Sequence, residues 1–456
     1  MSNSSIFLYF LVVISFLLYV CIKINRRKYL FSIFNIGVYI YFFSIVISPI
    51  FFYYNESWLA LRISSACSMW DYLNESMCIN LIGFLFFILF LLLFEFKSHS
   101  PTFLINYSER YNRYISDLSI NLFFIVFVIL FVYICLLFCH GFPLFNLKRT
   151  FYLNTGISPV YLFVNQGIYL FSLYYGIRFV LYKKNLFFCL LGFFCLIMQG
   201  NRGVWLLGVL FPLLVIYIYQ IYFKKSHNVA FTQYKLISKK VTKKIFFLVP
   251  FFVIMGIFTQ FVRKGAYDVS IIMFFHELVF GNTFSDIRDG AFILSGFDNE
   301  YDFFLMGKTY LSALISFIPS SFSDFRYTWS WGRFTTGLFN FQNHFGLRGG
   351  NSLEAYLNFS WLAVIIVSFF QAIIISKLEL VFYTVFILKK YRFLGKEIFI
   401  YYILLKFYSC LSSSSASYDI YSTIFILLML RITTKLLKFS FRYRLCYWKR
   451  LCKNVV

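Results

Sequence analysis

Long apolar runs separated by short charged or polar clusters make up most of the chain. The first run covers Ile6 to Ile22 and ends at a basic segment, Lys23 to Lys28. A run of about 18 or more apolar residues can cross about 30 Å of hydrocarbon as a helix, which satisfies its own backbone polar groups. The pattern therefore predicts an all-α polytopic integral membrane protein with about eleven transmembrane helices. The predicted spans are residues 5–22, 29–53, 78–96, 118–139, 159–182, 186–200, 204–223, 245–262, 359–376, 398–411 and 420–434.

One long segment, residues 263–358, contains no such run and carries half of the 18 acidic residues. The chain thus divides into N-terminal membrane helices with about eight spans (1–262), a large outer loop with short helices (263–358), and C-terminal membrane helices with a basic tail (359–456). We expect the chemistry of the protein in the loop, because polar and ionisable side chains gather there.

The composition supports a membrane protein, with 61% hydrophobic residues, 13% charged residues and a mean hydropathy of +0.76. A net charge of +24 would suggest nucleic acid in a soluble protein. Here the basic residues flank the apolar runs, which is typical of contact with the bilayer, and no nucleic-acid partner is expected.

About two thirds of the 42 lysines and arginines fall on the same side of the predicted membrane as the segment Lys23 to Lys28. Because basic loops stay in the cytoplasm, the bias predicts an outer N-terminus, a cytoplasmic C-terminus and an outer 263–358 loop. In a bacterium this loop would face the periplasm or the cell exterior, where ATP and nucleotide sugars are absent.

Arginines on the predicted outer side are candidate phosphate ligands. Guanidinium groups bind phosphate through paired hydrogen bonds and stay charged at any relevant pH. A diphosphate at the membrane surface would suit them, although each could instead form a surface ion pair. The candidates are Arg202, which lies between Gly200 and Gly203, and Arg263, Arg288, Arg333 and Arg348 in the loop.

Carboxylates follow in the densest polar stretch. On a helix, Asp286 and Asp289 share a face at i, i+3, while Arg288 points elsewhere. Such carboxylates can take a proton from a sugar hydroxyl, bind hydroxyls or cap a helix.

Histidines add further candidate bases, because His276 precedes Glu277 and His344 lies four residues before Arg348. A lone histidine is more often structural. No paired carboxylates or His/Cys cluster occur at metal-ligand spacing, so neither a metal nor a cofactor is expected.

Three motifs then resemble a known family. Gly281–Leu294 (GNTFSDIRDGAFIL), Gly307–Pro319 (GKTYLSALISFIP) and Gly349–Leu362 (GGNSLEAYLNFSWL) follow about eight spans within a long outer loop. This arrangement is similar to that of the Wzy-type O-antigen and capsule repeat-unit polymerases.

The resemblance implies a glycosyltransferase of the bacterial cytoplasmic membrane that uses neither nucleotide sugar nor metal. It would transfer a growing glycan from undecaprenyl diphosphate to a single lipid-linked repeat unit. A chain-length regulator and a flippase are candidate partners. The candidate site comprises Glu277, Asp286, His276 and His344 as catalytic groups; Arg202, Arg288, Arg263, Arg333 and Arg348 for the diphosphate; and Asp289, Asn351, Glu354 and Tyr356 for sugars.

Two alternatives stay open. A flippase for lipid-linked oligosaccharide should carry charged residues in the middle of its helices, whereas the predicted spans are almost uncharged. An O-antigen ligase would share the outer loop but would pass the glycan to the lipid A core.

Overall fold

The structure is a computed structural model. It describes residues 3–25, 33–47, 69–97, 110–138, 158–199, 208–223, 286–318, 320–339, 346–382, 394–412 and 417–453, with single positions at 244, 250, 251 and 254. Across these ranges the regular elements are all helices. The predicted all-α class is therefore confirmed for the described part of the chain.

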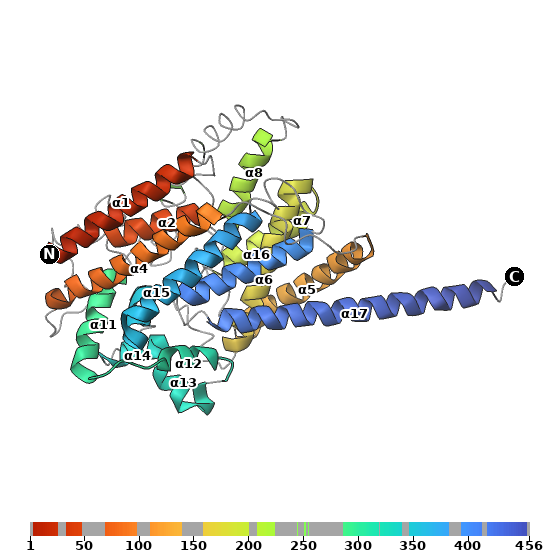
Figure 1. Cartoon of the computed structure of the whole chain (residues 1–456). Coiled ribbons are helices and arrows are strands. Elements are labelled where there is room, and N and C mark those ends of the chain that lie inside the picture. The colour runs from red at the N-terminus through yellow and green to blue at the C-terminus, as the bar shows by residue number, and fades with distance from the viewer. Residues whose placement is uncertain are drawn as a thin grey trace, which may run out of the picture. The chain divides into compact units, whose positions relative to one another are not determined.

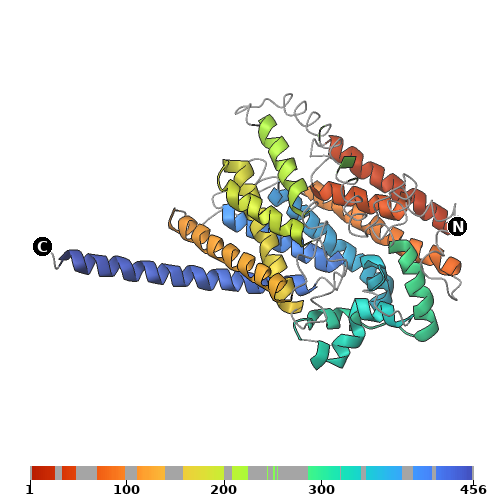
Figure 2. The same ribbon diagram turned by 180° about the vertical axis from the view of Figure 1, so that it is seen from behind.

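The helices are shown in Figures 1 and 2. The longer ones in the first half are α1 (Asn3–Asn25), α2 (Ile33–Phe42) with the π-helix η1 (Phe43–Ile47), α4 (Met69–Lys97), α5 (Arg110–Leu137), α6 (Ser158–Tyr182), α7 (Leu186–Met198) and α8 (Phe211–Phe223). Short helices follow: α11 (Asp286–Glu300), α12 (Lys308–Leu314), η4 (Ser320–Phe322), α13 (Asp324–Trp329) and α14 (Trp331–Gly337). The last three are α15 (Gly350–Val381), α16 (Leu394–Ser412) and α17 (Ser417–Lys453).

Five described helices contain a stretch that is long and apolar enough to cross a membrane. The stretches are Ser5–Lys23, Tyr72–Phe94, Asp117–Leu137, Gly350–Val381 and Ile420–Leu437. Shorter apolar helices cover Gly37–Val46, Leu186–Met198, Gly208–Ile218 and Ile398–Ser409. The structure thus supports a helical membrane protein but does not establish eleven spans. Most of the predicted span 245–262 lies outside the described residues.

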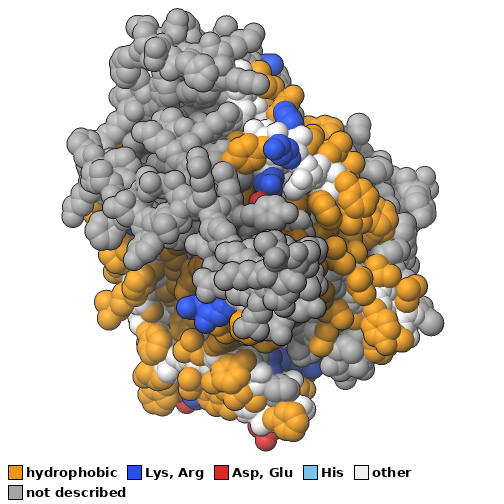
Figure 3. Space-filling model, turned by 90° about the vertical axis from the view of Figure 1, so that its right-hand side faces the viewer, with side chains coloured by type: hydrophobic (Ala, Val, Ile, Leu, Met, Phe, Trp, Pro, Cys, Tyr) orange, Lys and Arg blue, Asp and Glu red, His pale blue; other side chains and the backbone are white. Residues whose placement is uncertain are grey.

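The outer surfaces of these helices are apolar, as a bilayer requires. Phe7 on α1, Leu136 on α5 and Phe439 on α17 are each about 70% exposed. Hydrophobic side chains likewise cover much of the described surface in Figure 3. Helices of soluble proteins instead present polar side chains to water.

The chain forms two compact units. The first is formed by residues 1–101, 222–380 and 404–420, and the second by 102–221, 381–403 and 421–456. Because their segments alternate along the chain, the units do not coincide with the boundaries at 262 and 358 that we inferred from the apolar pattern. The first unit contains all the described candidate site residues.

Helix α15 is broken near the predicted end of the outer loop. Ser360 has a positive φ of 61°, so the helical hydrogen-bond pattern is interrupted there. The carbonyls of Leu357 and Asn358 accept hydrogen bonds from the backbone N–H groups of Leu305 and Met306, at 2.8 and 3.0 Å. The loop before α12 thereby satisfies groups that the break leaves without helical partners.

A substitution at Gly307 tests the contact between the loop before α12 and the break in α15. The φ of Gly307 is +81°, and a Cβ there would lie 2.6 Å from the ring of Phe359. We expect Gly307→Ala to destabilise the protein by about 2 to 4 kcal/mol, because the backbone strain and the clash both act. Gly337→Ala is the matched control, since a Cβ at Gly337 would meet nothing within 4 Å. Thermal unfolding in detergent measures both, and equal midpoints for the two variants would contradict the role of this contact.

Helix α11 packs closely against α4. Ser76 Oγ on α4 donates to the Ile287 carbonyl at 2.8 Å. A Cβ at Gly290 would lie only 2.4 Å from Ser76 Oγ, so a side chain there would displace this hydroxyl from its hydrogen bond. The contact holds the first turn of α11 on α4, near the start of α15 (Figures 1 and 2).

Candidate functional site

Two of the three motifs meet at the first turn of α11. The backbone N–H of Arg348, just before α15, donates to Asp289 Oδ2 at 3.3 Å. A Cβ at Gly350 would lie 3.8 Å from Asp286 Oδ2. The motifs Gly281–Leu294 and Gly349–Leu362 are therefore neighbours in the fold, although about 60 residues separate these contacts in the sequence.

Asp286 is half-buried and occupies the first position of α11. Burial raises the pKa of its carboxyl to about 6, and the neighbouring charge of Asp289 adds to this rise. The guanidinium of Arg348 opposes the rise, because it favours the ionised carboxylate. A carboxyl with this pKa can accept a proton near neutral pH, as a general base must.

Arg288 does not point away from the aspartates, so that expectation is wrong. Its Nε and Nη2 both donate to Asp289 Oδ1, at 3.0 and 2.8 Å, and the Arg288 side chain is buried. The reason is packing: the first turn of α11 is enclosed, and a buried guanidinium needs a nearby carboxylate. Arg288 is therefore better suited to orient Asp289 than to bind a diphosphate, and Asp289 is no longer a good sugar ligand.

Arg333 and Arg348 are exposed, as ligands for a diphosphate should be. The Arg333 guanidinium lies over the ring of Tyr327, 4.9 Å from its centroid. Of the two, Arg348 is the one that acts electrostatically on Asp286. It combines a positive charge, access to solvent and proximity to a candidate base.

Asn351 and Glu354 do not fit the sugar-binding role that we expected. Both belong to α15 and are buried. The Asn351 amide donates to Gln371 at 2.8 Å, and its oxygen accepts from Tyr41 at 3.4 Å. The physical reason is that α15 begins before its break, which turns part of the predicted loop into a packed helix.

Five of the sequence candidates lie outside the described residues. They are His276, Glu277, His344, Arg202 and Arg263. Their roles stay predictions. The described site therefore consists of Asp286 and Arg348, supported by the Arg288 and Asp289 pair.

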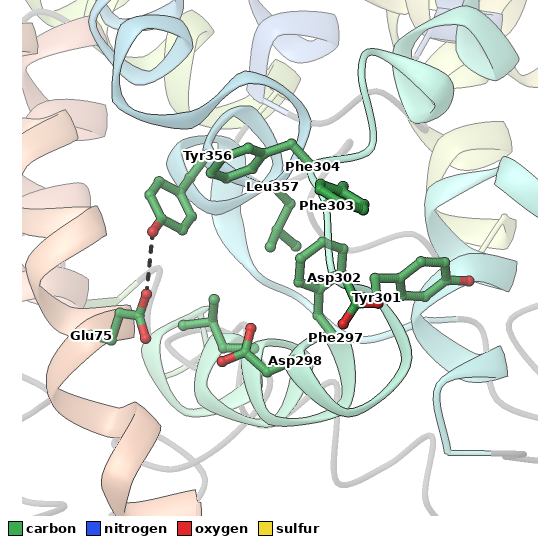
Figure 4. Close-up of a pocket in the computed structure, with 10 residues that line it drawn as sticks. Glu75, Phe297, Asp298, Tyr301, Asp302, Phe303, Phe304, Tyr356 and Leu357 are labelled. Atoms are coloured by element: carbon green, nitrogen blue, oxygen red, sulfur yellow. Dashed lines mark hydrogen bonds between the residues drawn. The ribbon is translucent and has the colours of Figure 1, made fainter.

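A pocket at the far end of α11 brings together residues that the sequence did not single out. Its volume is about 230 Å³, and Glu75, Asp298 and Asp302 supply three carboxylates (Figure 4). Tyr356, which we predicted to contact sugars, donates from its hydroxyl to Glu75 Oε1 at 3.3 Å. Tyr301, Leu294, Phe297, Phe303, Phe304 and Leu357 complete the lining.

The chemistry of this pocket suits a carbohydrate. Carboxylates accept hydrogen bonds from hydroxyl groups, while aromatic rings pack against the apolar faces of sugars. The sequence weakly indicated that Asp298 and Asp302 belong to a site, because they are acidic residues in the predicted outer loop. The same weak indication applied to Glu75, because it lies in the predicted outer segment between the spans 29–53 and 78–96, but its place in the pocket depends on the packing of α11 on α4.

No group of three or more His, Cys, Asp or Glu side chains suited to a metal occurs in the part of the chain that the structure describes. The three pocket carboxylates accordingly do not form such a group. That the protein works without a metal stays a prediction.

Comparisons with models of protein families, with curated proteins and with solved structures find no match. The resemblance of the three motifs to a polymerase family therefore stays a prediction.

Proposed function

We propose that this chain is a membrane glycosyltransferase that joins oligosaccharide repeat units carried on undecaprenyl diphosphate, on the outer side of the bacterial cytoplasmic membrane. One observation carries the proposal. Asp286, whose raised pKa suits a general base, lies against Gly350 where two motifs meet and is influenced by the charge of the exposed Arg348. The product would be an O-antigen or a capsular polysaccharide.

The residues fit a single displacement. Asp286 takes the proton of an acceptor hydroxyl, and the oxygen forms a bond to the anomeric carbon of the donor sugar. The bond from that carbon to the diphosphate oxygen breaks, and its electron pair stays on the diphosphate. Arg348 offsets the negative charge that grows on this leaving group. The charge of Arg348 also favours the ionised form of Asp286 that accepts the proton.

The pocket supports an oligosaccharide as the substrate. Asp286 begins α11, and Asp298 lies near its other end. At the rise of an α-helix, about 18 Å of axis separates the two positions. A single sugar cannot contact both, whereas several linked sugars can occupy the pocket while the end of the glycan reaches Asp286.

A buried ion pair favours a second candidate, a flippase. Lys23 Nζ lies 2.7 Å from Glu379 Oε2, and Lys23 is only 1% exposed. Buried charges in membrane helices are frequent on transport pathways. Lys23 and Glu379, however, lie close to the ends of their helices, which also suits a tie between α1 and α15.

A metal-free extension reaction tests the proposal. Purified protein in lipid nanodiscs would receive undecaprenyl-diphosphate-linked oligosaccharide in EDTA, with no nucleotide sugar. We expect ladders of longer lipid-linked glycan on a gel. Loss of extension that magnesium restores would contradict the metal-free mechanism. Movement of the lipid across vesicles without extension would favour the flippase, and transfer only to a lipid A core acceptor would favour the ligase.

A further inference from the structure

Asn80 on α4 has a buried oxygen without a hydrogen-bond partner among the described residues. The side chain is 1% exposed. Its Nδ2 donates to the Ser76 carbonyl at 3.0 Å. Because a carbonyl only accepts hydrogen bonds, this contact fixes the orientation of the amide, and Oδ1 faces the other way.

The free oxygen faces Gly350, at the start of α15. A Cβ at this position would lie 3.1 Å from Asn80 Oδ1 and 3.8 Å from Asp286 Oδ2. The two oxygens thus flank the same small volume, which glycine leaves open. Gly350 has a φ of +72°, so a side chain there would be strained as well as crowded.

Three other groups interact electrostatically with Asp286. Arg348 precedes α15 and favours the ionised carboxylate, while Asp289 on α11 disfavours it. Tyr41 on α2 is close enough to interact electrostatically with Asp286. Both Asn80 Oδ1 and an ionised carboxylate can only accept hydrogen bonds. A direct hydrogen bond between these two groups therefore needs the protonated carboxyl of Asp286 as its donor.

We propose that Asn80 is a positioning residue for Asp286, whose protonated carboxyl donates a hydrogen bond to Asn80 Oδ1, directly or through one water beside Gly350. The inference rests on the proposed function. The proton leaves the acceptor hydroxyl, resides on Asp286 in this bond, and passes to solvent once the glycan has moved. Asn80 thereby helps Asp286 to hold the proton during the transfer.

Infrared spectroscopy of the purified protein tests this pair without any activity assay. The carboxyl stretch of protonated Asp286 would be assigned by its loss in Asp286→Asn and followed as a function of pH. Asn80→Leu removes the acceptor, so the titration midpoint of Asp286 should fall by about one pH unit. Asn80→Asp adds a second carboxylate, which should raise the midpoint.

Asn165→Leu is the matched control, because Asn165 on α6, in the other compact unit, also has a buried amide oxygen without a partner among the described residues. It should leave the titration unchanged. An unchanged midpoint in a folded Asn80→Leu or Asn80→Asp protein would overturn the inference.

A polymer assay separates the two proposals. If glycan extension occurs, the acidic limb of its pH profile should move to lower pH in Asn80→Leu, together with the infrared midpoint. If no extension occurs while the infrared shifts are found, the proposed function fails and the pairing of Asn80 with Asp286 stands.

Discussion

Asp286→Asn should lower the rate of glycan extension by about 100-fold to 10,000-fold, the usual contribution of a general base. The amide keeps the size of the carboxyl but cannot take the proton of the acceptor hydroxyl. In the wild type, activity should fall as the pH drops through about 6, because burial raises the pKa of Asp286 to this value and protonation removes the base. Initial rates between pH 5 and 8 measure both effects.

The stability of the same variant provides the control, and the sign follows from the raised pKa. The folded protein holds the Asp286 proton more tightly than the unfolded chain, so this group favours folding at low pH and loses that contribution as the pH rises through about 6. Asp286→Asn carries no such loss, and at pH 8 it should be at least as stable as the wild type. A folded Asp286→Asn protein with the wild-type rate would contradict the assignment of Asp286 as the base.

Substitution of Arg288 should lower the stability of the protein, whereas substitution of Arg348 should lower the rate of glycan extension. Arg288→Ala leaves Asp289 charged and buried, and we expect it to destabilise the protein by about 3 to 5 kcal/mol. Arg348→Ala removes an exposed side chain, so stability should change little while the extension rate falls by about 10-fold to 100-fold.

Two further variants sharpen this comparison. Arg348→Lys keeps the charge but loses the paired hydrogen bonds. If Arg348 binds a diphosphate, the extension rate of this variant should therefore stay well below that of the wild type. Arg431→Ala is the matched control, because Arg431 on α17 is an exposed arginine that is not a candidate ligand. Wild-type rates for Arg348→Ala would remove this residue from the site. A stable Arg288→Ala protein would contradict the structural role of the buried pair.

The sequence predicted the helical class better than it predicted side-chain contacts. Apolar runs determine where helices can cross a membrane, so the class follows directly from the pattern. The pairing of Arg288 with Asp289 was missed, because adjacent residues on a helix usually diverge and only the burial of this turn forces them together.

The packing at the start of α15 could not be predicted from the sequence. Residues 350–358 were assigned to the outer loop with short helices, because polar side chains interrupt the apolar run. The chain is helical there, since backbone groups before α12 satisfy the carbonyls at the break near Ser360. That partnership joins segments about 50 residues apart and has no local signature. For the same reason the pocket of Glu75, Asp298 and Asp302 became visible only in the fold.

The most direct test of the central proposal is to count the lipid diphosphate released for each glycosidic bond formed. Wild-type protein in nanodiscs would receive undecaprenyl-diphosphate-linked oligosaccharide, and mass spectrometry would quantify free undecaprenyl diphosphate and glycan length together. The proposed displacement predicts one lipid diphosphate per bond, with both products reduced in parallel in Asp286→Asn and Arg348→Ala. Glycan extension without release of lipid diphosphate, or no extension by folded wild-type protein on any lipid-linked oligosaccharide, would contradict it.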